Sequence, residues 1–89
     1  MKGISSEFVR RGTSLIVQTQ DVPGATSYIE TLIYSSGRLI YSRRKALPSL
    51  RLSASWPDQL NKLLTDVHGM VLEDLAAGRL DRYLPGPSL

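Results

Sequence analysis

One histidine and its acidic neighbours are the side chains of this sequence that could bind a metal or transfer a proton. The chain contains 89 residues, with no cysteine and a single histidine, His68. A metal site would therefore need His68 together with carboxylates such as Asp66 and Glu73. On the helix expected here, both carboxylates lie on a different side from His68, which has leucines on its flanks. We therefore expect a histidine at the boundary of the core, and no metal site.

The other patterns typical of enzymes are missing from the sequence. Its glycines form neither a G-x-G-x-x-G motif nor a P-loop, and its serines form no G-x-S-x-G motif. The adjacent Glu73 and Asp74 point about 100° apart on a helix, so they do not converge on one reacting atom. We predict a non-enzymatic protein with no cofactor, and no small-molecule substrate is evident.

A different chemistry is suggested by the stretch YIETLIYSSGRLIYSRR, residues 28–44. Its tyrosine rings, if displayed on a sheet, could stack on the bases of a single-stranded nucleic acid. Its arginines and the lysine that follows could hold phosphates. None of the RNA-recognition consensus signatures is present. This candidate surface consists of Tyr28, Tyr34 and Tyr41 with Arg38, Arg43, Arg44 and Lys45.

The basic residues are concentrated in the first half of the chain. Residues 1–51 hold eight Lys or Arg against three acidic residues, and residues 52–89 hold three against five, so the two parts carry +5 and −2. This asymmetry suits a nucleic acid, an acidic partner, or two copies packed front against back. The short run SRRK, residues 42–45, is interpreted more simply as solvated charge that protects a sheet edge.

The length of the chain limits its core. A domain of this size buries only about 60% of the surface that its unfolded chain exposes, so its stability is marginal. Without cysteine, disulfides cannot supplement that core. Association with another chain is then the leading way to gain stability.

No segment has the length and apolarity of a membrane span or of a secretory signal. The absence of cysteine gives no sign of an oxidising compartment. We therefore expect a cytoplasmic protein with no membrane partner.

Three short segments have the composition of β-strands. Residues 14–20 are rich in β-branched side chains and are followed by a Pro-Gly turn signal. Residues 28–34 and 39–44 flank Ser36 and Gly37, and glycine allows the positive φ of a two-residue hairpin turn. The three segments are predicted to form an antiparallel meander.

Counting outward from this turn predicts the register and the two faces of the hairpin. Tyr34 should lie opposite Leu39, and Glu30 opposite Arg43, where the opposite charges support the register. Successive residues of a strand point to opposite sides of the sheet. One face should carry Ile29, Ile33 and Ile40 with Thr31, Ser42 and Arg44, and the other Tyr28, Leu32, Tyr34, Leu39 and Tyr41 with Glu30 and Arg43.

A long helix is predicted over residues 56–77. Ser55 is the expected N-cap, and Gly78 the expected left-handed residue after the helix. Apolar residues recur at steps of three and four and should face the sheet, while Met70 and Leu72 widen the apolar arc on either side. The stripe consists of Leu60, Leu63, Leu64, Val67, Val71 and Leu75.

These elements predict an α+β fold, in which a three-stranded antiparallel meander packs against one long C-terminal helix. Residues 1–84 should form a single small domain, and residues 85–89, which contain two prolines, a flexible tail. The segment 45–55 is expected to be a loop whose leucines lie against the core.

One helix covers only one face of such a sheet, and the isoleucine face is the expected one. The tyrosine-bearing face would then leave a larger apolar patch in water than a monomer usually exposes. We expect a homodimer that buries this face and the flank of the helix, and hence an interaction or accessory protein. The alternatives are a nucleic-acid-binding module, a different protein docked on the face, or a segment of the same chain folded over it. The predicted interface consists of Tyr28, Leu32, Tyr34, Leu39, Tyr41, Met70 and Leu72.

Overall fold

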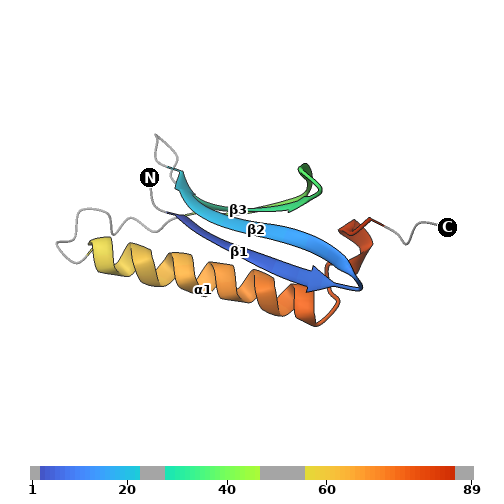
Figure 1. Cartoon of the computed structure of the whole chain (residues 1–89). Helices are drawn as coiled ribbons and strands as arrows, with labels where there is room; N and C mark the ends of the chain where they lie inside the picture. The colour runs from blue at the N-terminus through green and yellow to red at the C-terminus, as the bar shows by residue number, and fades with distance from the viewer. Residues whose placement is uncertain (1–2, 23–27, 47–55, 86–89) are drawn as a thin grey trace.

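The structure, a computed structural model, describes residues 3–22, 28–46 and 56–85, with only the backbone of residues 56 and 57. A sheet lies along one side of a single long helix (Figure 1). The α+β class is therefore confirmed. The strands are β1 (Gly3–Arg10), β2 (Thr13–Val22), β3 (Tyr28–Ser35) and β4 (Arg38–Ala46), and the helices are α1 (Trp56–Ala76) and the short 3-10 helix η1 (Asp81–Tyr83).

The sheet has one strand more than the sequence predicts. Its order is β1-β2-β3-β4, and every neighbouring pair is antiparallel. The three-stranded meander is wrong in this detail, because it leaves out β1. The overlooked signal is the turn before β2, where Arg11 and Gly12 have φ values of 54° and 75°. Ser36 and Gly37 have values of 52° and 78°, so both hairpins close with a two-residue turn of the primed kind.

All three predicted strands are present, and each is longer than expected. β2 spans residues 13–22 rather than 14–20, β3 spans 28–35 rather than 28–34, and β4 spans 38–46 rather than 39–44. β4 therefore includes the first two residues of the segment 45–55 that was expected to be a loop. The rest of that segment, with its leucines and Ser55, lies outside the described residues, as do residues 86–89 of the expected tail.

The helix begins where predicted and ends one residue earlier than predicted. Gly78 has a φ of 81°, in the left-handed region. The amide of Arg79 donates to the carbonyl of Asp74 (3.0 Å), and the amide of Gly78 donates to that of Leu75 (3.2 Å). These two bonds form a Schellman motif, which confirms the role predicted for the glycine.

A β-bulge in β4 changes the predicted register of the hairpin. Tyr34 lies opposite Leu39 as predicted, but the preceding residue Ile33 lies opposite Tyr41. Ile40 is therefore an extra residue on β4, without a counterpart on β3. A bulge of this kind shifts every later residue of the strand to the other face.

The shifted register corrects the predicted faces. Glu30 pairs with Arg44 and not with Arg43. Tyr41 and Arg43 lie on the helix side of the sheet, whereas Ser42 and Arg44 lie on the side turned away from α1. The prediction that Tyr41 shares a face with the other hairpin tyrosines is therefore wrong, and its cause is the single extra residue.

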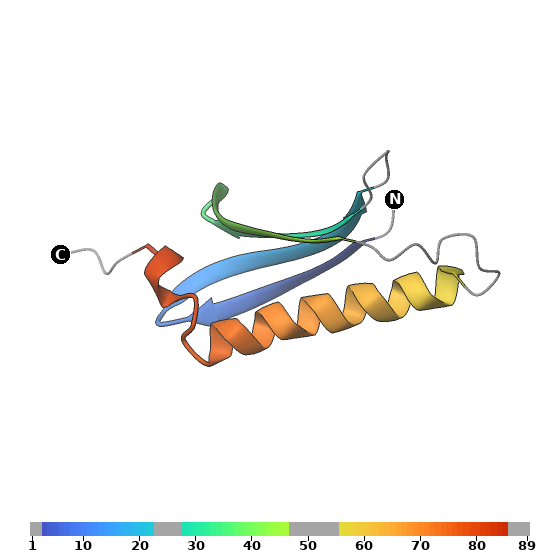
Figure 2. The same ribbon diagram turned by 180° about the vertical axis from the view of Figure 1, so that it is seen from behind.

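The core lies between α1 and one face of the sheet. α1 packs against β1, β2 and β3, and the opposite face has no described element against it (Figures 1 and 2). The predicted stripe on α1 faces the sheet and is buried, apart from the half-buried Leu63. The buried apolar residues form two clusters: Leu15, Val17, Ile33, Val71, Leu75 and Leu80 in one, and Ile29, Leu60, Leu64 and Val67 in the other.

Two groups of ion pairs fix the segment that follows α1. Asp81 of η1 accepts hydrogen bonds from Arg10 (3.0 and 3.1 Å) and is 3.0 Å from the Arg11 guanidinium. Asp74 is 2.9 Å from the guanidinium groups of both Arg43 and Arg79. Hydrogen bonds from Arg10 and from Arg43 lower the pKa values of Asp81 and Asp74, respectively. The segment is thus held to the β1–β2 turn through Asp81 and to α1 through Arg79, and the same Asp74 of α1 also pairs with Arg43 of β4.

None of the helices in the described part of the chain combines the length and the apolar character that crossing a bilayer requires.

Candidate interaction surface

The face of the sheet turned away from α1, which we call the open face, carries one largely apolar row. Cross-strand pairing places Glu7, Ile16, Tyr34 and Leu39 side by side across all four strands. Ile16 is 41% exposed and Leu39 is 50% exposed. Tyr34 is half-buried between them. Three neighbouring strands therefore present apolar side chains that folding has not buried.

The next two rows, counted away from the β3–β4 turn, are more polar. Leu32 is the apolar member of the first of them, with Ser5, Gln18 and Ser42. The second contains Gly3, Gln20, Glu30 and Arg44. The other apolar residues of the open face lie apart, Val9 on the edge strand β1 and Val22, Tyr28 and Ala46 at the far end. We call the central group of Ile16, Leu32, Tyr34 and Leu39 the apolar patch.

A hollow of about 470 Å³ adjoins the apolar patch near the β3–β4 turn. Ile16 and Tyr34 line it together with Ser14, Gln18, Ser36 and Gly37. The hairpin β3–β4 also curves away from α1 toward its turn (Figures 1 and 2). The apolar patch is thus part of a concave surface, which can enclose a partner side chain better than a flat one.

Tyr28 and Arg44 lie at the other end of the open face, and both are engaged within the chain. The Arg44 guanidinium forms an ion pair with Glu30 (3.0 Å) and lies 4.7 Å from the centre of the Tyr28 ring. Gln20 donates a further hydrogen bond to Glu30 (3.3 Å). Tyr28, although on the predicted face, is separated from the apolar patch by this polar row.

Tyr41 and Arg43 form a separate group on the helix side. The Tyr41 ring lies 4.7 Å from the ring of Tyr83 on η1. Arg43 donates hydrogen bonds to the Tyr41 hydroxyl and to Asp74, both at 2.9 Å. Burial acts to lower the pKa of Arg43, but these hydrogen bonds outweigh it and raise the pKa.

The structure therefore divides the predicted nucleic-acid surface. Tyr28 and Tyr34 share the open face, whereas Tyr41 lies on the other side. Two of the four basic residues, Arg43 and Arg44, are paired with carboxylates, and Arg38 and Lys45 are exposed. No face of the described residues brings the three rings together with all four cations.

The predicted helix flank is divided as well. Met70 is 53% exposed, whereas Leu72 is half-buried and packs against the core. The two positions are about 200° apart around a helix, so one flat partner cannot contact both. Only Met70 is available for contact.

His68 lies inside a row of hydroxyl groups between α1 and the sheet. His68 is 5% exposed. Its Nε2 atom is 2.9 Å from the Ser6 hydroxyl, and its Nδ1 atom is 2.7 Å from the Thr19 hydroxyl. The Thr19 hydroxyl is in turn 3.1 Å from that of Thr31. Burial lowers the pKa of His68. Both ring nitrogens thus form hydrogen bonds inside the fold. The described residues contain no group of three or more side chains that could hold a metal ion.

Sequence reasoning missed several of these residues. Ile16 contributes to the apolar patch, and its signal was the unbroken apolar run Leu15 to Val17, in which the middle residue must face away from the core. Ser6 and Thr19 contact His68 from 62 and 49 residues away in the chain. No local pattern reveals contacts of that kind.

No protein-family model, no curated protein and no solved structure matches this chain. Its function must therefore be inferred from its own residues.

Proposed function

We propose that this chain is a non-enzymatic interaction protein of the cytosol that forms a homodimer through the open face of its sheet. The observation that carries the proposal is the apolar row of Ile16, Tyr34 and Leu39, which no described element covers. Apolar side chains on adjacent strands cost free energy in water, and at about 25 cal/mol per Å² a partner that covers them gains several kcal/mol.

A second copy fits this row because the row is close to symmetric about Tyr34. A two-fold axis that runs along β3 would place Tyr34 against its own counterpart, and Ile16 of one copy against Leu39 of the other. Isologous contacts of this kind are self-complementary, and two-fold dimers are the commonest oligomers. Packed sheets lie about 10 Å apart, a distance that side chains of this size fill.

The row that contains Gln20, Glu30 and Arg44 is compatible with the same two-fold arrangement. The axis would bring the two copies of Glu30 together, and like charges at a buried interface are costly. Each Glu30 is already neutralised by Arg44 at 3.0 Å and accepts a hydrogen bond from Gln20 at 3.3 Å. This pairing within each copy removes most of the repulsion between the copies.

The non-enzymatic part of the proposal rests on the enclosure of His68. A general base must reach the proton that it abstracts. His68 is 5% exposed and contacts hydroxyl groups on both sides, which gives the ring a structural role.

Sedimentation velocity of the full chain and of Leu39→Glu tests the proposal. The parent protein should sediment as a dimer at about 100 μM, a concentration at which interfaces of micromolar affinity are occupied. Leu39→Glu should be a folded monomer, because it places a charge against Ile16 of the other copy, at a position that is already 50% exposed in one chain.

Met70→Glu is the matched control. Met70 lies on α1, which packs against the opposite face of the sheet, and is 53% exposed, so its replacement should leave the dimer intact. A parent protein that is monomeric at this concentration contradicts the proposal, as does a Leu39→Glu variant that remains dimeric. A monomer would leave a different protein as the candidate partner of the face.

A further inference from the structure

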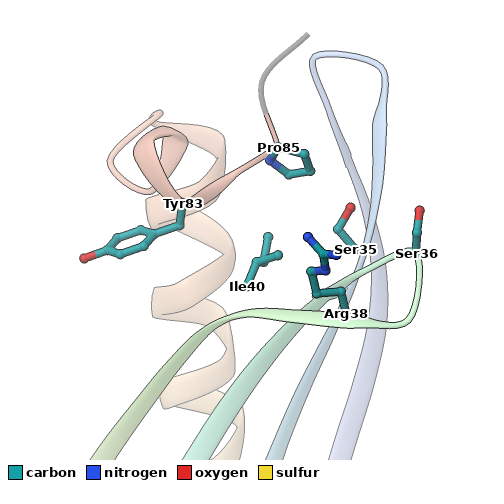
Figure 3. A pocket seen from close by; sticks show the side chains of 6 residues that line it. All are labelled: Ser35, Ser36, Arg38, Ile40, Tyr83 and Pro85. Atoms are coloured by element: carbon teal, nitrogen blue, oxygen red, sulfur yellow. The ribbon is translucent and has the colours of Figure 1, made fainter. Parts of the chain in front are cut away.

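A pocket on the other side of the β3–β4 hairpin has a composition different from that of the open face. It has a volume of about 430 Å³ and lies between the hairpin turn and the segment after η1 (Figure 3). Ser35, Ser36 and Arg38 supply polar groups, and the apolar part of its lining consists of Ile40, Tyr83 and Pro85. Volumes of this size are typical of small-molecule sites.

The β-bulge gives this pocket its apolar wall. In a regular strand, neighbouring residues point to opposite faces. The bulge places Ile40 and Tyr41 both on the helix side, where each packs against the edge of the core. Ile40 is thereby directed into the pocket (Figure 3). Bulges frequently occur where a side chain must be re-aimed toward a site.

Tyr83 is held in place from two sides. Its ring lies 4.7 Å from the Tyr41 ring, and the Arg82 guanidinium lies 5.0 Å from its centre. The residue is 37% exposed, so part of the ring remains available to a ligand. Asp81 next to it is bound by Arg10 and Arg11, which also fixes the backbone of η1.

The charge of the pocket favours an anion. Arg38 is exposed and its guanidinium extends into the pocket toward Pro85 (Figure 3). The described lining contains no carboxylate that could neutralise it. Asp81, at the start of the neighbouring η1, is already paired with two arginines.

We propose that this pocket binds a small organic carboxylate with an apolar, ring-sized body. The planar Arg38 guanidinium can donate two parallel hydrogen bonds to a carboxylate. The hydroxyl groups of Ser35 and Ser36 can donate to it as well. The apolar body then lies against Ile40, the Tyr83 ring and Pro85. The pocket shares Ser36 with the hollow on the open face, but none of its lining residues belongs to the apolar patch, so binding should not depend on the dimer.

The lining also indicates which anions fit poorly. A phosphate or nucleotide carries two or more charges and is usually held by several cations or backbone amides. One arginine beside three apolar residues matches a single charge attached to an apolar group.

The test uses 3-phenylpropionate as the probe and amide chemical shifts of the full chain as the readout. Titration should shift the amides of residues 35–40 and 83, with a dissociation constant of about 1 mM, as expected for a ligand of this size. Arg38→Gln keeps a polar side chain with N–H donors but shortens it and removes its charge, and it should weaken binding about tenfold. Arg38 is exposed and follows the turn, so the variant should melt at the temperature of the parent protein.

Two controls separate specific binding from surface effects. Lys62→Gln removes an exposed positive charge from α1, outside the pocket lining, and should leave the affinity unchanged. The neutral analogue 3-phenylpropionamide, tested on the parent protein, should bind at least about tenfold more weakly, since it lacks the charge. Equal binding of acid and amide overturns the proposal, as does an affinity that Arg38→Gln does not change or the absence of shifts at about 10 mM probe.

Discussion

The two faces of the sheet are built from the same strands, yet their side chains differ in how far the chain itself buries them. On the helix side, Leu15 and Val17 are completely buried. On the open face, Ile16 lies between them in sequence and is 41% exposed. The strand alternation explains why one residue points away, but it does not explain why that residue is isoleucine. The helix side supplies the buried core, whereas the apolar residues of the open face are the ones that the proposed dimer would cover.

A pair of matched leucine replacements should show the largest difference between the two faces. Leu75 is 0% exposed and Leu39 is 50% exposed. Leu75→Ala should lower the free energy of unfolding by about 2–5 kcal/mol, because it leaves a cavity beneath the sheet. Leu39→Ala should lower it by less than about 1 kcal/mol. Urea denaturation at low protein concentration, where association adds little, measures both. Equal losses would show that the open face is also part of a core.

A smaller effect is expected at two of the left-handed glycines, Gly37 in the β3–β4 turn and Gly78 after α1. Gly37→Ala introduces a Cβ with nothing within 4 Å, so only the φ of 78° is unfavourable, at about 1 kcal/mol. A Cβ at Gly78 would lie 2.8 Å from the Arg10 guanidinium and 3.1 Å from the Asp81 carboxylate. Gly78→Ala should therefore cost more, about 2 kcal/mol, since it also disturbs this ion pair.

Thermal unfolding of the two glycine variants measures this difference. Ala at the turn of β3–β4 should give the smaller decrease in melting temperature. The opposite order would mean that the Arg10–Asp81 pair moves aside without loss.

The smallest effect should be a pH dependence confined to the helix side. Burial lowers the pKa of His68 in the folded state below its ordinary value of 6.5. The unfolded chain therefore binds the proton more tightly, and protonation favours unfolding. The stability linked to His68 should be complete above about pH 6.5 and decrease as the pH falls through the folded-state pKa.

Urea denaturation between pH 5 and pH 8 tests this linkage, with His68→Gln as the control. The variant should lose the dependence in this window, whereas Asp74 and Asp81, whose pKa values are lowered, act at more acidic pH. A parent protein that gains stability as the pH falls toward 5 would contradict the assigned direction.

The local parts of the fold were predictable from the sequence. The Ser36-Gly37 turn, the helix and its Gly78 end each depend on a few adjacent residues, and each is confirmed. β1 was missed because Ser5, Ser6 and Glu7 interrupt its apolar alternation, although Arg11-Gly12 offered the same turn signal as the second hairpin.

The candidate sites were less predictable, for physical reasons. One unpaired residue, Ile40, moves Tyr41 and Arg43 to the other face, and no sequence pattern announces a bulge. Leu39 precedes that point in the count from the turn, and Leu32 and Tyr34 belong to β3, which has no extra residue, so all three keep the predicted face. The pocket beside η1 depends on Tyr83 meeting β4, a contact between distant segments.

The row of hydroxyl groups around His68 also has a mechanical consequence. The row lies between the two apolar clusters. Apolar packing alone would let a helix shift along its axis at little cost in free energy. A slip of one turn, about 5.4 Å, would carry the imidazole away from Ser6 and Thr19 and into contact with aliphatic side chains. Directional bonds at this point, together with the Arg43–Asp74 pair near the end of the helix, therefore select one position of α1 on the sheet, much as a polar residue selects one alignment in a coiled coil.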